Sequence, residues 1–187
     1  MSFTFIMHST ESLRAFVGLL AGKATVQADT VLKHVGLALR EPATYLTEFA
    51  DDLSERGIDE LTPDIAANLP QTALVHELEK ASLVGEVDWK ADAEDIVWNV
   101  NNVLEQQGRP QLEGDDLEIT DEDEVESCLR YVGSVLRARH LTLIYLLDLD
   151  SDSYPLSIVA AADMPRFTQL AHELSVRFEV YDGAVQA

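Results

Sequence analysis

The sequence has little of what small proteins use for covalent or metal-based stability. Its 187 residues contain one cysteine, Cys128, so no intramolecular disulfide can form, and a reducing compartment is expected. The five histidines are scattered, and none belongs to the two-histidine pattern of a zinc helix. Gly-rich phosphate loops and the Gly-x-Ser-x-Gly elbow are missing as well. We therefore expect no metal, no cofactor and no nucleotide or acyl-transfer chemistry.

Basic residues are also scarce. Thirteen Lys and Arg stand against 34 Asp and Glu, which gives a formal net charge of −21 at pH 7. This charge repels phosphate backbones and anionic lipids, so binding of nucleic acid or membrane is disfavoured. It serves either solubility alone or attraction of a cationic partner.

Long apolar runs are lacking too. The longest, residues 141–147, is far shorter than the roughly 20 residues that cross a bilayer as a helix. Residues 1–8 have no basic segment ahead of an apolar one, so they do not resemble a secretory signal peptide. The sequence therefore predicts a cytoplasmic protein.

Apolar residues at helical spacing dominate the N-terminal part of the chain. They predict one helix that ends at Gly22, a second that stops before Pro42 and a third that stops before Gly57. Residues 57–70 contain two prolines and several loop-forming residues, which predict a hinge. A further helix follows, with an apolar face made of Leu74, Val75 and Leu78.

Strand-like segments alternate with helices in the C-terminal part. Residues 83–89 predict a short strand, and Asp92 is expected to cap the helix after it. Residues 141–147 are apolar on both faces, which predicts a central strand, and they form a hairpin with residues 154–160. A helix and a last strand at residues 176–181 complete a small sheet.

These elements predict an α+β fold in which a helix-rich N-terminal part packs on a small C-terminal sheet of hairpin, helix and strand. Residues 1–187 form either one domain or an N-terminal helical lobe, 1–82, beside an α/β part, 83–187. The apolar stripe of the helix around residues 125–136 places Cys128 on its buried side. A core thiol is expected there rather than a nucleophile.

An acidic segment precedes that helix. Nine of the fourteen residues between Glu113 and Glu126 are acidic and none is basic. Thr120 is a suitable helix cap, and acids in a first helical turn are stabilised by about 0.3–1 kcal/mol each. The other interpretation is a contact surface for a basic protein. Its candidate partner-binding residues are Asp115, Asp116, Glu118, Asp121, Glu122, Asp123 and Glu124.

Three aspartates, Asp148, Asp150 and Asp152, alternate after the predicted central strand. The spacing resembles the first motif of the haloacid dehalogenase phosphatases, but that motif has Thr or Val in place of Asp152, and only 35 residues follow for its other motifs. A calcium loop of EF-hand type needs Gly and Glu where Ser153 and Val159 stand. Polar side chains that cap their own turn explain the pattern without an ion.

Two segments resemble a bacterial family described as a domain of unknown function. They are Asp88-Trp89-Lys90-Ala91-Asp92-Ala93-Glu94-Asp95 and Asp150-Ser151-Asp152-Ser153-Tyr154. The resemblance covers residues 74–181 and implies a bacterial cytoplasmic α/β domain. In composition the chain is also similar to immunity proteins, which neutralise a toxin by covering its site.

The sequence favours binding over catalysis. The expected function is an acidic protein-binding module, such as an immunity or inhibitor protein, that covers a basic site on a partner. The alternative is a divalent-metal-dependent hydrolase that uses Asp148, Asp150 and Asp152, with Asp88 or Asp92 nearby to complete a carboxylate site.

Overall fold

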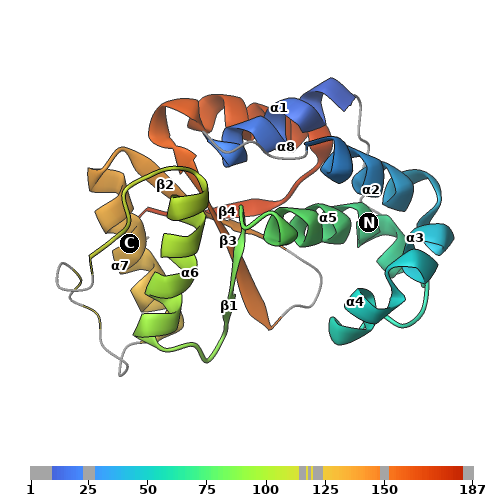
Figure 1. Ribbon diagram of the computed structural model, residues 1–187, viewed down its shortest axis with the longest axis horizontal. Helices are drawn as coiled ribbons and strands as arrows, with labels where there is room; N and C mark the ends of the chain where they lie inside the picture. Colours follow the sequence, from blue (N-terminus) through green and yellow to red (C-terminus); the bar gives the residue numbers. More distant parts are fainter. Residues whose placement is uncertain are drawn as a thin grey trace.

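A four-stranded antiparallel sheet with helices against both faces forms the centre of the protein (Figure 1). The computed structural model describes residues 10–22, 28–113, 117, 119, 124–147 and 152–182. The helices are α1 (Thr10–Ala21), α2 (Ala28–Arg40), α3 (Pro42–Glu48), α4 (Ala50–Glu55), α5 (Pro63–Lys80), α6 (Ala93–Gln106), α7 (Val125–Ala138) and α8 (Met164–Leu174). The strands are β1 (Gly85–Asp88), β2 (Leu141–Leu146), β3 (Ser153–Ala160) and β4 (Phe178–Tyr181).

The sheet confirms the predicted α+β class. Its strand order is β1-β3-β2-β4, so the predicted hairpin forms its central pair, with Leu143 opposite Ile158. The last strand, β4, pairs with β2, as Tyr181 lies opposite Leu143. The short strand β1 also joins this sheet, at the edge beside β3, a position that the sequence did not indicate.

Strand β2 is buried on both faces because its side chains alternate between two hydrophobic cores. Ile144 and Leu146 belong to a first core, formed with α1, α2, α5 and α8. Leu141 and Leu143 belong to a second core, formed with α6 and α7. A strand covered on both sides is apolar throughout rather than alternating, which explains its run of apolar residues.

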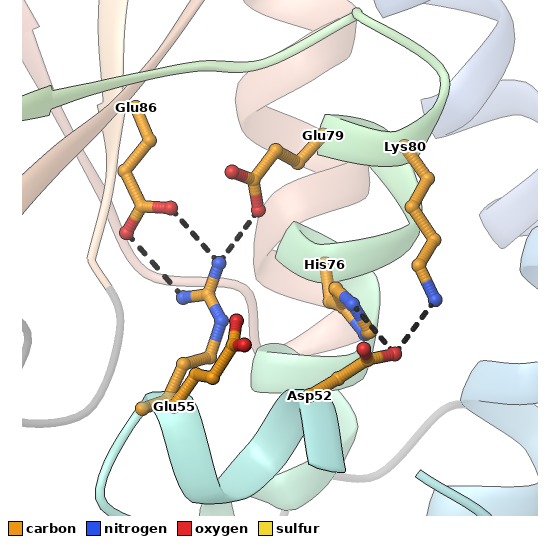
Figure 2. Close-up of a pocket in the computed structure, with 7 residues that line it drawn as sticks. Asp52, Glu55, His76, Glu79, Lys80 and Glu86 are labelled. Atoms are coloured by element: carbon orange, nitrogen blue, oxygen red, sulfur yellow. Dashed lines mark hydrogen bonds and ion pairs between the residues drawn. The ribbon is translucent and has the colours of Figure 1, made fainter.

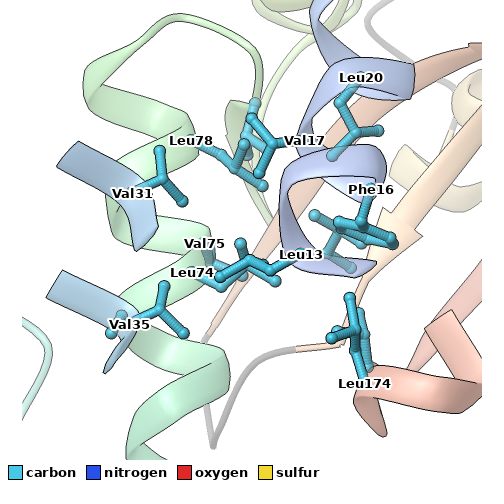
Figure 3. Packing of buried hydrophobic residues seen from close by; sticks show 14 of the residues in the cluster. Leu13, Phe16, Val17, Leu20, Val31, Val35, Leu74, Val75, Leu78 and Leu174 are labelled. Carbon is cyan, nitrogen blue, oxygen red and sulfur yellow. The ribbon is translucent and has the colours of Figure 1, made fainter. Parts of the chain in front are cut away.

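The first core joins the N-terminal helices to the C-terminal sheet (Figure 3). Phe16 of α1 stacks on Phe167 of α8 with the ring centroids 4.9 Å apart. Val35 of α2 and Leu74 of α5 are fully buried in the same core. Residues on both sides of the predicted boundary at residue 82 thus share one core, although the division into lobes itself stays a prediction.

Two N-terminal features differ from the prediction. The predicted third helix is broken at Phe49, which ends α3 and precedes α4. The predicted hinge ends early, because the Thr62 side chain caps α5 and Pro63 takes its first position, where a missing N–H costs nothing. Pro70 lies inside α5 and is buried, and it removes one backbone hydrogen bond from the helix. Packing against the rest of the protein keeps α5 helical at this position.

Candidate functional site

The predicted acidic surface is only partly described by the structure. Glu124 is exposed and is the N-cap residue of α7, where its backbone carbonyl accepts from the N–H groups of Ser127 and Cys128. The other candidate residues, Asp115, Asp116, Glu118, Asp121, Glu122 and Asp123, lie outside the described residues. Thr120 lies outside them as well, and α7 begins only at Val125.

A neighbouring surface on α6 exposes a large aromatic side chain. Trp98 is 62% exposed, while Ile96, Val100 and Val103 of the same helix face the second core. Three exposed acids of α6 lie three, four and seven residues from Trp98, which places them on the same side of the helix. They are Asp95, Glu94 and Glu105.

The start of α6 adds a second exposed tryptophan. Asp92 caps the helix as predicted, because its carboxylate accepts the Asp95 N–H at 2.8 Å. Trp89 lies between β1 and α6 and is 52% exposed. The Lys90 ammonium lies 4.3 Å from the centroid of its ring. The sequence reasoning did not select Trp98, although its place opposite the apolar stripe of α6 was a readable signal.

The predicted carboxylate site is only partly described by the structure. The backbone carbonyl of Asp152 accepts the Trp89 N–H at 3.0 Å, while Asp148 and Asp150 lie outside the described residues. The Asp88 carboxylate accepts the Lys90 N–H at 2.7 Å, and that of Asp92 caps α6. Among the described residues, no three His, Cys, Asp or Glu side chains are grouped so that they could hold a metal ion.

A pocket of about 450 Å³ lies where α4, α5 and β1 meet (Figure 2). We call it the α4–α5–β1 pocket. Helix α4 and its C-cap, helix α5 and strand β1 supply its lining from three separate segments of the chain. The lining residues are Asp52, Glu55, Arg56, His76, Glu79, Lys80 and Glu86.

Arg56 bridges two carboxylates on one side of this pocket. Its Nη2 lies 2.6 Å from Oε2 of Glu79 and 3.0 Å from Oε2 of Glu86, and its side chain is 17% exposed. The Ser153 hydroxyl of β3 donates a further hydrogen bond to Glu86. A planar guanidinium holds two carboxylates in this way because its N–H groups diverge in one plane.

The pKa values of Glu79 and Glu86 are shifted in opposite directions. Burial of Glu79, its hydrogen bond with Glu86 and the negative charge of Glu86 together raise the pKa of Glu79 to about 7. Burial also acts on Glu86, but the hydrogen bonds from Ser153 and Glu79 and the charge of Arg56 outweigh it and lower the pKa of Glu86. Glu79 is therefore the more readily protonated of the two, and Glu86 stays ionised at neutral pH.

The other side of the pocket centres on Asp52. Its Oδ2 lies 3.0 Å from Nζ of Lys80 and 3.4 Å from Nε2 of His76. The hydrogen bond from Lys80 lowers the pKa of Asp52. Burial, reinforced by the charge of Lys80, lowers the pKa of His76, so its imidazole is neutral at pH 7.

The family of the chain follows from its sequence match. Its fold places it among helix-rich α+β domains with a small antiparallel sheet. The chain belongs to the family described as Domain of unknown function (DUF6630), whose model matches residues 12–181. This confirms the resemblance and extends it to the N-terminal helices, which residues 74–181 had not included.

No curated protein and no solved structure matches the chain. Within the described part of the chain, no helix is long and apolar enough to cross a membrane.

Proposed function

We propose that this protein is an acidic protein-binding module whose partner presents a basic surface, and that Trp98 anchors the contact. The exposure of Trp98 carries the proposal. Trp is enriched among the few interface residues that supply most of the binding free energy. Trp89, which is 52% exposed, is a second aromatic group available at the start of α6.

The charges around Trp98 indicate the chemistry of the partner. Glu94, Asp95 and Glu105 are exposed on the same side of α6, and α7, which Glu124 caps, packs beside α6 (Figure 1). An aromatic anchor surrounded by carboxylates complements a surface rich in Lys and Arg. The net charge of −21 attracts such a partner from a distance.

The finer proposal is a bacterial cytoplasmic immunity or inhibitor protein that covers a basic functional site. Excess acid and an exposed aromatic anchor suit that role, because a basic site on a toxin is the complementary surface. The alternative of a metal-dependent hydrolase has less support, since the carboxylates of Asp88 and Asp92 already accept backbone hydrogen bonds.

The first prediction concerns the partner contact at Trp98. A photo-crosslinking amino acid placed at position 98, in the cells that produce the protein, is expected to give one discrete crosslinked species whose protein is basic. Thr168, exposed on α8, is the matched control position and is expected to give no such species.

With that purified partner, Trp98→Ala is expected to weaken binding roughly 30-fold, because hot-spot truncations cost about 2 kcal/mol or more. An acidic crosslinked protein, or the same species at both positions, would contradict the proposal.

The second prediction concerns the acidic segment. Neutralising Asp115, Asp116, Glu118 and Glu122 together to Asn or Gln is expected to slow association with that partner and to flatten its salt dependence. Dissociation should change little, since peripheral charges act mainly on the encounter. Stopped-flow association at low and high salt measures both effects. Identical rates and salt slopes would assign the segment to solubility and helix capping alone.

A further inference from the structure

We propose that the α4–α5–β1 pocket binds a small organic cation through an ammonium or guanidinium group, independently of the protein partner. The pocket volume of about 450 Å³ lies within the range of small-molecule sites, roughly 300–1,000 Å³. The balance of charge and the unused hydrogen-bonding capacity both favour a cation.

The lining carries more acid than base. Asp52, Glu55, Glu79 and Glu86 face two permanent cations, Arg56 and Lys80. His76 does not add a third, because burial keeps its imidazole neutral at pH 7. The lining is therefore negative whether or not Glu79 holds its proton.

The two cations are already engaged, whereas one carboxylate is free. Arg56 is held between Glu79 and Glu86, and Lys80 is paired with Asp52. Within the described residues Glu55 has no ion-pair or hydrogen-bond partner, although it lines the pocket (Figure 2). An anionic ligand would have to displace a carboxylate from Arg56, but a cation can bind Glu55 directly.

A buried polar group in the wall distinguishes this pocket from a chance cluster of acids. The side chain of His76 is only 8% exposed and lines the pocket, and its Nδ1 has no hydrogen-bond partner among the described residues. Buried polar atoms nearly always have a partner, so an unpaired one in the wall of a pocket is consistent with a bound ion or molecule.

The proton on Glu79 couples ligand binding to pH. A ligand cation beside Glu79 and Glu86 stabilises a second negative charge, so binding releases that proton. The charged groups that face Glu79 are Arg56 from the C-cap of α4 and Glu86 from β1. On its own helix, His76 and Lys80 line the same pocket but contact Asp52. Because Glu79 titrates at about 7, a ligand that binds only its ionised form gains about tenfold in affinity from pH 6 to pH 8.

The test is calorimetric titration of the full chain with 1,4-diaminobutane and butylguanidinium at pH 6 and pH 8. Both probes keep their charge over this range, since alkylammonium groups titrate near pH 10. We expect saturable binding, several-fold to about tenfold tighter at pH 8, with proton release visible between buffers of different ionisation enthalpy. The neutral analogue 1,4-butanediol and the anion succinate are expected not to bind.

Three variants connect the binding to the pocket. Glu79→Gln is expected to flatten the pH dependence, and Glu55→Gln to weaken binding several-fold without changing stability, because Glu55 is exposed. Glu11→Gln, exposed on α1, is the matched control and is expected to behave as wild type. Absence of saturable binding below about 10 mM, equal binding of succinate, or no effect of Glu55→Gln would overturn the proposal. None of these results bears on the crosslink at position 98.

Discussion

Arg56→Met is expected to destabilise the protein by about 3 kcal/mol at pH 8 and by much less at pH 5. The substitution removes the cation that lies between Glu79 and Glu86. Removing one member of a buried ion pair costs roughly 3–5 kcal/mol, because the remaining charge is left without compensation. Both carboxylates are partly exposed, 33% and 27%, so solvent screening places the loss at the lower end of that range.

The dependence on pH follows from the direction of the pKa shifts. A carboxyl group whose folded pKa is raised contributes stability that is present below its unfolded pKa and is lost as the pH rises through the folded value. In wild type, the stability that Glu79 contributes is lost as the pH rises from about 4.5 to about 7. The pKa of Glu86 is lowered, so its contribution is lost only at more acid pH. Without Arg56 the pKa of Glu79 rises further and that of Glu86 also rises, so the loss relative to wild type increases from pH 5 to pH 8.

Urea unfolding of wild type and variant at the two pH values measures this difference. Lys80→Met is the matched control, because Lys80 is 47% exposed and pairs with the 44% exposed Asp52. An exposed pair contributes about 0–1 kcal/mol, so this control is expected to lose little at either pH. Equal losses for the two variants, or a loss from Arg56→Met that does not change with pH, would contradict the assigned role of Arg56.

The local elements of this fold could be predicted because their signals lie within short stretches of sequence. The cap at Asp92 and the two-sided strand at residues 141–147 needed only the residue types and their spacing. Pro70 was misread because proline usually interrupts a helix, whereas here the burial of α5 outweighs the lost hydrogen bond. The position of β1 in the sheet could not be derived either, since pairing with β3 joins segments far apart in the chain.

The α4–α5–β1 pocket was not predicted for the same reason. Its charged residues come from the ends of two helices and from an edge strand, and in sequence Arg56, Glu79 and Glu86 look like ordinary surface residues. Only tertiary structure brings the two carboxylates to one guanidinium and raises the pKa of Glu79. Trp98 is different, because its place outside the apolar stripe of α6 could have been read from helical spacing alone.

Gln107→Leu is expected to cost about 3 kcal/mol of stability, a large effect for a residue outside any candidate site. Gln107 is 1% exposed. Its Nε2 donates to the carbonyl oxygens of Leu20 and Ile158, both at 2.7 Å, and its Oε1 accepts from Nε of Arg109 at 2.7 Å. One amide therefore connects the end of α1 to strand β3.

Among the residues that the structure describes, neither carbonyl has another hydrogen-bond donor. Leu20 is in the last turn of α1, where carbonyls have no partner within the helix. Strand β1 pairs with β3 only as far as Leu156, so the edge of β3 at Ile158 lies beyond its end. A leucine of similar size fills the space but leaves both oxygens buried without a donor, and each such group costs about 1–3 kcal/mol.

Urea unfolding decides whether this amide has the expected role. Gln106→Leu is the matched control, since Gln106 is the exposed neighbour at the end of α6, and exposed substitutions usually stay within about 0.5 kcal/mol. Native-state hydrogen exchange should also show faster exchange in α1 for Gln107→Leu, because the variant disconnects that helix from β3. A stability within about 1 kcal/mol of wild type would mean that water replaces the amide at both carbonyls, and that the packing of α1 in the first core holds it in place without this amide.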